Sequence, residues 1–278
     1  ILQSADALQS EYHDISKAGL ETAKVVGVDD TSARHNGRNG SCLVIQNDFF
    51  AHFVTTNSKS RLNFLQTLRG TSTIYVFDET AIVYLQNNRY VKPSLIELLE
   101  YHKGKICSNH REYMNFLSQI GISKLNTGKK ALIALEEAAT LGGAINNDLN
   151  PELIIMSDRA GQFNTLINIF CWIHVERTFK RMLPKNDNER KEIQQVRDDI
   201  WDIYRELQDY KKNPSVEAKT KIVRQFEEKF QRSVESLELA AALKRMFKQS
   251  LFIRSGYMRG FFENQPNNDT KPNSDYYQ

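Results

Sequence analysis

The chain has 278 residues, of which 40% are hydrophobic and 26% charged, which is typical of a globular protein and excludes a disordered one. No apolar run approaches the roughly 20 residues of a membrane-spanning helix, and the N-terminus does not resemble a signal peptide. We therefore expect no membrane partner. Cys42, Cys107 and Cys171 are too few and too scattered for a disulfide framework, which favours a reducing, cytoplasmic setting.

The charge is unevenly distributed along the chain. Residues 176–260 carry 20 Lys and Arg against 14 Asp and Glu, whereas the rest of the chain carries 17 against 20. A basic C-terminal third permits a polyanionic partner. Solvated helix faces would produce the same bias, so the charge alone does not identify a partner.

Hydrophobic spacing and turn residues predict the elements in chain order. The first part should hold a helix over 1–22, a strand over 24–29, a β-hairpin over 41–56, a helix over 58–70 and a strand over 71–77. Further helices are predicted over 95–102, 110–122 and 128–145, then a strand over 153–156, a long amphipathic helix over 186–212 and another helix through Phe230. Strands interleaved with helices indicate an α/β fold, with one mixed sheet within residues 24–157.

Two of the predicted strands lead into carboxylates. "VVGVDDT" (25–31) runs a buried strand into Asp29 and Asp30, and "LIIMSD" (153–158) runs another into Asp158. A charge at the end of a buried strand is costly to desolvate unless something pairs with it. Two converging aspartates would form an oxygen-only site suited to Mg²⁺ or Mn²⁺, at the sheet edge where α/β proteins bind ligands. The alternative is ordinary turn or helix-capping chemistry.

Longer motifs point to a family. "VDDTSARHNGRNGSCLVIQNDFFAHFVTTNSKSRLNFL" (28–65), "IIMSDRAGQFNTLINIFCWIHVERTFKRMLP" (154–184) and "IWDIYRELQDYKKNP" (200–214) resemble the insertion sequence sixty-six family of bacterial transposases, in the expected order. The resemblance covers roughly residues 15–245. It implies an RNase H-like core that performs metal-dependent DNA strand cleavage and transfer, with double-stranded DNA as partner, a bacterial, nucleoid-associated location, and a homo-oligomer as one option.

The resemblance also implies site residues. The first catalytic, metal-binding Asp falls on Asp29, with Asp30 as the alternative because neighbouring side chains on a strand point to opposite faces. The second falls on Asp158. On this basis the core is expected over 24–185, after a helical lead-in over 1–23. A helical insertion is expected over 186–250, and a divergent, disordered tail over 251–278.

The family's catalytic Glu has no recognisable counterpart. It lies in a segment that reads approximately "PLHNN-x-SE-x-x-IR", whereas the stretch after residue 250 reads "LFIRSGYMRGFFENQPNNDT". Glu263 and Glu176 are the substitutes to consider. Because this acid is missing and the chain starts at Ile1, we expect a copy truncated at both ends and inactive. A non-catalytic DNA-binding or assembly remnant and an unrelated metal-dependent nuclease or phosphatase remain as alternatives.

Basic residues near the motifs are candidates for contacts with DNA phosphates. They occur in the basic loops over 33–40 and 58–61 and at a strand-to-helix junction around residue 172. The candidates are Arg34, His35, Lys59, Arg61, His174 and Arg177. For the last two, a helix start with a surface arginine is an equally good interpretation.

Two other motifs are weaker. Asp78 in "FDET" follows a predicted strand, but its position predicts a helix N-cap rather than a catalytic acid. The C-x-x-H pairs at 107–110 and 171–174 could together form a Cys₂His₂ zinc site. Neither pair lies in a recognisable zinc knuckle, so we favour no zinc.

Overall fold

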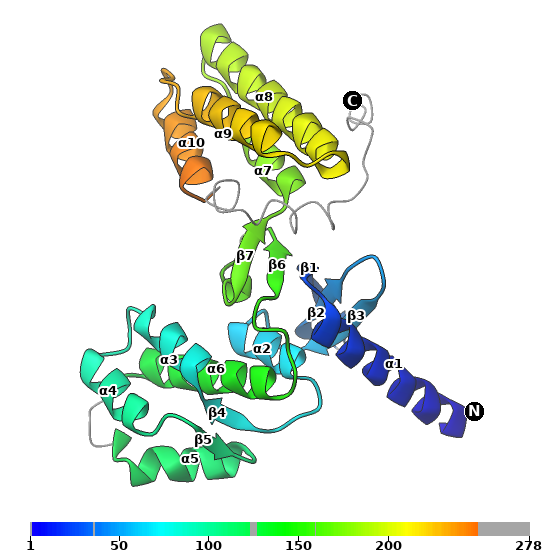
Figure 1. Cartoon of the computed structure of the whole chain (residues 1–278), viewed down its shortest axis with the longest axis vertical. Helices are drawn as coiled ribbons and strands as arrows, with labels where there is room; N and C mark the ends of the chain where they lie inside the picture. Colours follow the sequence, from blue (N-terminus) through cyan, green and yellow to red (C-terminus); the bar gives the residue numbers. More distant parts are fainter. Residues whose placement is uncertain (1, 36, 123–126, 159, 250–278) are drawn as a thin grey trace. The chain divides into compact units, whose positions relative to one another are not determined.

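The structure is a computed structural model that describes residues 2–35, 37–122, 127–158 and 160–249. It is an α/β protein with a mixed five-stranded sheet and flanking helices (Figure 1), which confirms the predicted fold class. The chain divides between Asn168 and Ile169 into two compact units. Each unit is described by itself.

The five-stranded sheet has the order β3-β2-β1-β6-β7. β1 pairs antiparallel with β2, β2 antiparallel with β3, and β1 parallel with β6. This pairing confirms the predicted β-hairpin and places the strand predicted over 153–156 beside the one predicted over 24–29. β7 lies just before the strand-to-helix junction predicted around residue 172, although no bounds were predicted for this strand. The strands are β1 (Val25–His35), β2 (Arg38–Gln46), β3 (Ala51–Thr56), β6 (Ile154–Ser157) and β7 (Ile167–Phe170).

β1 is longer than predicted. The expectation that this strand ends at Asp29 is wrong, because every residue from Asp29 to His35 pairs with β2. Gly37, with φ of +74°, helps the chain to reverse, since glycine adopts that conformation without a steric penalty. The predicted basic loop over 33–40 is therefore mostly the end of a two-stranded ribbon, and Asp29 lies in the middle of a strand.

A second, two-stranded sheet overturns the prediction of one sheet within 24–157. β4 (Tyr75–Phe77) pairs antiparallel with β5 (Lys105–Cys107) and not with the larger sheet. β4 packs against α6 (Lys129–Asn146). A Cβ on Gly142 of α6 would lie 2.2 Å from the carbonyl oxygen of Val76. The helix therefore approaches β4 at a distance that only glycine permits, which ties β4 to α6.

The other helices of the first unit follow their capping signals. Ser60 caps α2 by accepting a hydrogen bond from the Asn63 amide (3.2 Å), and Asp78 caps α3 by accepting one from the Ala81 amide (2.8 Å). The predicted N-cap role of Asp78 is confirmed. These helices are α1 (Leu2–Thr22), α2 (Arg61–Arg69), α3 (Glu79–Gln86), α4 (Pro93–Tyr101), α5 (His110–Gln119) and the 3₁₀ turn η2 (Gly161–Phe163).

One face of the five-stranded sheet is covered. Apolar side chains on this face pack against α1, α2 and α6, burying Val26, Leu43, Ile155, Phe64 and Leu141. Because side chains alternate along a strand, the residues between them point to the opposite face. On β1 and β2 that opposite face includes Asp29, which is exposed, and Val44, which is half-buried.

The second unit is helical where it is described beyond residue 186, as predicted. α8 (Asp187–Lys212) begins at its N-cap Asn186, which accepts a hydrogen bond from the Glu189 amide (2.8 Å). No strand follows among residues 186–249. The predicted tail over 251–278 lies outside the described residues. The remaining helices are α7 (Trp172–Lys180), α9 (Val216–Phe230) and α10 (Leu237–Gln249).

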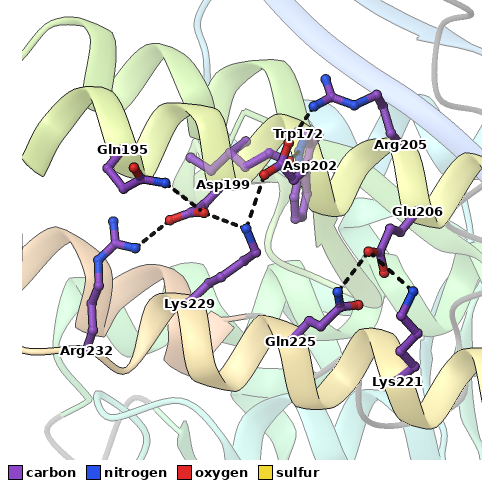
Figure 2. A network of polar contacts seen from close by, with 11 residues as sticks. Trp172, Gln195, Asp199, Asp202, Arg205, Glu206, Lys221, Gln225, Lys229 and Arg232 are labelled. Carbon is purple, nitrogen blue, oxygen red and sulfur yellow. Dashed lines mark hydrogen bonds and ion pairs between the residues drawn. The ribbon is translucent and has the colours of Figure 1, made fainter. Parts of the chain in front are cut away.

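A buried carboxylate joins α8 to α9. Asp199 is 2% exposed and receives Lys229 Nζ at 2.5 Å and Arg232 Nη1 at 2.5 Å (Figure 2). Burial raises the pKa of Asp199, but the hydrogen bonds from Lys229 and Arg232 outweigh it, so the pKa lies below its usual value. The helical unit is therefore held together by a charged network as well as by apolar packing.

Candidate functional site

The first predicted catalytic aspartate, Asp29, lies on β1, and the second, Asp158, directly follows the neighbouring parallel strand β6. The pairing of β1 with β6 sets Val25 opposite Ile154 and Gly27 opposite Met156. Asp29 and Asp158 each stand two residues further along their own segment. A register continued by those two residues would bring the aspartates level, on the same side of the sheet. The fold thus brings to one region two acids that are 129 positions apart in the sequence.

Both carboxylates are held by local backbone and keep capacity to bind a cation. Asp29 is exposed, and its Oδ1 accepts a hydrogen bond from the Asp30 amide at 2.8 Å. Asp158 is half-buried, and its Oδ1 accepts one from the Ala160 amide at 2.8 Å. Within the described part of the chain, no Lys or Arg forms an ion pair with either acid. Each therefore offers a second carboxylate oxygen to a ligand.

Asp30 has a different environment. Its side chain is 8% exposed, and its Oδ1 lies 2.7 Å from Lys59 Nζ. Gln162 Nε2 donates to its Oδ2 at 2.7 Å, and Lys59 also donates to its backbone carbonyl at 3.0 Å. These contacts fix β1 to the start of α2 and to η2. Between the two neighbouring acids, the geometry therefore favours Asp29 as the metal ligand and gives Asp30 a structural role.

Sequence reasoning missed Gln162, which holds Asp30 from the "SDRAGQF" segment. The signal was available, since Gln162 follows Asp158 by four residues in a quoted motif. Its partner, however, is 132 positions away, and no spacing rule predicts that contact.

The donor set suits a hard cation. Two carboxylates supply oxygen ligands, and Mg²⁺ commonly binds one or two carboxylates and keeps several waters. Among the described residues, no group of three or more His, Cys, Asp or Glu side chains is arranged to hold a metal ion. Asp29 and Asp158 therefore fit Mg²⁺ or Mn²⁺ as a partial site, and neither C-x-x-H pair belongs to a zinc-type cluster.

The substitute acids do not complete the site in the described structure. Glu176 is 3% exposed, and its Oε1 accepts a hydrogen bond from Arg197 Nε at 2.7 Å. An ion-paired, buried carboxylate is not available to a metal unless that pair breaks. Glu263 lies outside the described residues.

The DNA-contact candidates of the first unit fall into two groups. Arg34 is exposed near the end of the β1–β2 ribbon, where His35 is the last residue of β1. Lys59 already pairs with Asp30. Arg61 donates through Nη1 to the Tyr84 hydroxyl at 3.0 Å and through Nη2 to the Gly161 carbonyl.

Arg61 is also part of a buried ion pair. Its Nη1 lies 3.6 Å from Oε2 of Glu137, which also accepts a hydrogen bond from the Tyr84 hydroxyl at 2.5 Å. Burial and the neighbouring Glu137 carboxylate raise the pKa of Tyr84, so this hydroxyl stays protonated at neutral pH. Arg61 thus joins α2, α3 and α6, and a phosphate contact would be a second role for it.

The two candidates in the second unit lie on α7. Arg177 is exposed. His174 is half-buried, and its Nδ1 is enclosed without a hydrogen-bond partner among the described residues. The predicted junction is confirmed to the extent that β7 ends at Phe170 and α7 begins at Trp172.

The fold and the site together define an α/β protein with a mixed sheet, with one aspartate on β1 and another directly after the adjacent parallel strand β6. Among curated proteins, the chain is 31% identical over 240 residues to "Uncharacterized protein y4jO" of Sinorhizobium fredii (strain NBRC 101917 / NGR234). The match covers 86% of this chain and 67% of that protein. The chain therefore belongs to the same family as y4jO.

The other comparisons returned nothing. No family model matches the chain, and no solved structure matches it. In the described residues, no helix combines the length and apolar character needed to cross a membrane.

Proposed function

We propose that the chain is the catalytic core of a metal-dependent DNA transposase with an RNase H-like sheet, in which Asp29 and Asp158 bind Mg²⁺ or Mn²⁺. One observation carries the proposal: β1 and β6 pair in parallel, with an acid two residues beyond the last matched pair on each. The antiparallel meander beside this pair agrees with the RNase H-like core that the sequence resemblance implies. The proposed partner is double-stranded DNA.

The chain's own residues would position the metal and the DNA. Asp29, which is exposed on β1, and Asp158, just after β6, would each contribute a carboxylate oxygen. Lys59 and Gln162 hold the neighbouring Asp30 and so fix the direction of Asp29 on β1. A divalent ion bound there would supply Lewis acidity to a phosphate group of the DNA backbone.

A non-catalytic DNA-binding or assembly remnant is the second candidate, and a specific observation favours it. A two-metal reaction needs a further acid for the second ion. The described residues provide no three-ligand group, and Glu176 is occupied by Arg197. The two candidates share metal binding by the aspartates, and they differ in whether the chain cuts the DNA strand once the missing third acid is restored.

Manganese binding tests the proposal directly. The wild-type chain should bind Mn²⁺, measured by electron paramagnetic resonance of the free ion. Asp29→Asn and Asp158→Asn should each weaken binding at least about tenfold, as loss of a ligand or of its support does. Asp48→Asn removes the same charge from an exposed turn and is the matched control. Wild-type Mn²⁺ affinity in both site variants would refute the metal site, and with it the proposed function.

A further inference from the structure

A cavity of about 570 Å³ opens in the first unit, on elements that the proposed metal site does not use. It lies between the start of α2, the end of α3 with the turn that follows, α6, and the segment before β7. Its volume is within the usual range of small-ligand sites, about 300–1,000 Å³. The wall includes Arg61, Arg89, two tyrosines and several amide side chains, and no Asp or Glu. We call this cavity the tyrosine groove.

Two cations converge on Tyr90 in the wall of the tyrosine groove: Arg89, which also lines the groove, and Lys130, which reaches Tyr90 from the start of α6. Arg89 Nη2 donates to the Tyr90 hydroxyl at 2.6 Å, and Lys130 Nζ lies 3.5 Å from the same oxygen. Both charges also lie over the Tyr90 ring, at 4.8 and 4.7 Å from its centroid. In the part of the chain that the structure describes, neither cation has a carboxylate partner.

Two like charges that share one phenol repel each other unless an anion joins them. The hydrogen bond from Arg89, followed by that from Lys130, lowers the pKa of Tyr90 below its ordinary value. The missing counter-charge is therefore one that a ligand can supply, and phosphate suits paired Arg and Lys side chains.

The wall of the groove has unused hydrogen-bonding capacity. Arg61 is fixed by Tyr84 and Glu137, yet its Nε is buried without a hydrogen-bond partner among the described residues. The hydroxyl of Thr165, which also lines the groove, is buried and likewise finds no partner in the described part of the chain. Buried polar atoms without partners are unusual and destabilising. A polar ligand in the groove would satisfy them.

We propose that the tyrosine groove binds one nucleotide unit of a single-stranded DNA segment. The phosphate lies between Arg89 and Lys130, and the base lies among the tyrosines and amide side chains of the wall. Single strands are bound by cationic tracks with interleaved aromatic rings, because an unpaired base can leave the stack, whereas duplex bases cannot enter a recess. This inference rests on the proposed function for its choice of DNA, but it uses none of the proposed metal ligands.

Binding of a short fluorescent oligo(dT) in the presence of EDTA tests the groove without metal or cleavage. The test variant is Arg89→Gln with Lys130→Gln. The control is Lys24→Gln with Arg111→Gln, which removes the same charge from exposed positions of the same unit that form no ion pair in the described structure. Loss of the contacts to this one phosphate should lower the salt slope by about 0.7 and weaken binding about 5-fold at about 0.1 M salt.

A second variant probes the wall. Thr165→Val removes the unpartnered hydroxyl with little change of shape, so it should weaken oligo(dT) binding several-fold without lowering thermal stability. Arg89 and Lys130 are exposed, so their variants should fold, which circular dichroism would verify.

The outcomes separate the two proposals. If the wild type binds oligo(dT) and the Arg89/Lys130 variant matches its control in affinity and salt slope, the groove inference is overturned while the transposase proposal stands. If the wild type binds free dAMP through these residues but not oligo(dT), the DNA-strand interpretation of the groove is overturned. Loss of Mn²⁺ binding in the aspartate variants, with oligo(dT) binding unchanged, supports both proposals.

Discussion

Asp29 and Asp30 are adjacent, yet the structure predicts opposite consequences for replacing them. Asp29 is exposed and accepts one local hydrogen bond, which an asparagine oxygen can also accept. Asp29→Asn should therefore change the free energy of unfolding by no more than about 0.5 kcal/mol, as expected for a surface substitution. Asp30→Asn removes the charge from an 8% exposed carboxylate paired with Lys59.

The magnitude for Asp30 follows from its two contacts. A hydrogen bond with a charged partner contributes about 1.5–3 kcal/mol, against about 0.5–1.5 kcal/mol for a neutral one. The Lys59 side chain is 41% exposed, so solvent screens the pair and reduces the difference. Asparagine retains an oxygen for Lys59 or Gln162. We therefore expect Asp30→Asn to lower the free energy of unfolding by about 1–2 kcal/mol.

The stabilisation of the folded chain by Mn²⁺ is a second measurement that distinguishes Asp29 from Asp30. Urea unfolding should be measured with EDTA and with Mn²⁺ at about 100 times its Kd, where binding to the folded state adds about 2.7 kcal/mol. The wild type and Asp30→Asn should gain this stabilisation, and Asp29→Asn should not. If Asp30→Asn loses the Mn²⁺ effect and Asp29→Asn keeps it, the assignment of Asp29 as ligand is wrong and the reasoning from strand faces fails.

The remaining predictions concern packing, pH and activity. Gly142→Ala should destabilise the first unit by at least about 1–3 kcal/mol in chemical unfolding, because its Cβ would meet the Val76 carbonyl at 2.2 Å, whereas Gly161→Ala meets nothing within 4 Å and should be near neutral. Because the pKa of Asp199 is depressed, its contribution is present above the unfolded pKa and lost as pH falls through the folded value. The helical unit should therefore lose stability below about pH 4, and Asp199→Asn should flatten that dependence. The 278-residue chain should bind DNA with a steep salt dependence but neither nick nor join it with Mn²⁺; robust cleavage that Asp158→Ala abolishes would contradict this.

Local signals predicted most of the helices. Asp78 is the N-cap that the sequence predicted, and Ser60, Gly70 and Asn186 cap helices that were predicted over 58–70 and 186–212. These signals are reliable because a cap and its helix lie within a few residues of each other. The long helix over 186–212 also has an apolar stripe that a single helical period explains.

The strands were predicted less well than the helices, because a strand is defined by a partner that lies far away in the sequence. The strand at 75–77 is apolar like the central strands, but its partner β5 lies about thirty positions later and belongs to a separate sheet. Nothing in a three-residue run specifies which sheet it joins. The extension of β1 past Asp29 was missed for a related reason. Polar residues on an exposed two-stranded ribbon lack the burial pattern that identifies a strand.

In the candidate site, too, local motifs were predicted and non-local contacts were not. Its two acids were found from motifs at strand ends, but the partners that distinguish Asp29 from Asp30 come from residues 59 and 162. The tyrosine groove was not predicted, because its cations stand in different segments, at 89 and 130, with no shared motif. Tertiary packing decides which distant segments meet in space, and the spacing of residues along the sequence does not reveal it.

Charge balance connects these observations. Within the described part of the chain, Asp30 is paired with Lys59 and Asp199 with Lys229, so each of these two acids has its own cation. Asp29 and Asp158 have none, although the sheet register brings them toward one another. Two carboxylates that approach without a cation repel each other, and the repulsion grows as water is excluded. Binding of DNA over this face would exclude water and bring further negative charge, so a divalent ion is the partner that lets both acids stay ionised beside a phosphate.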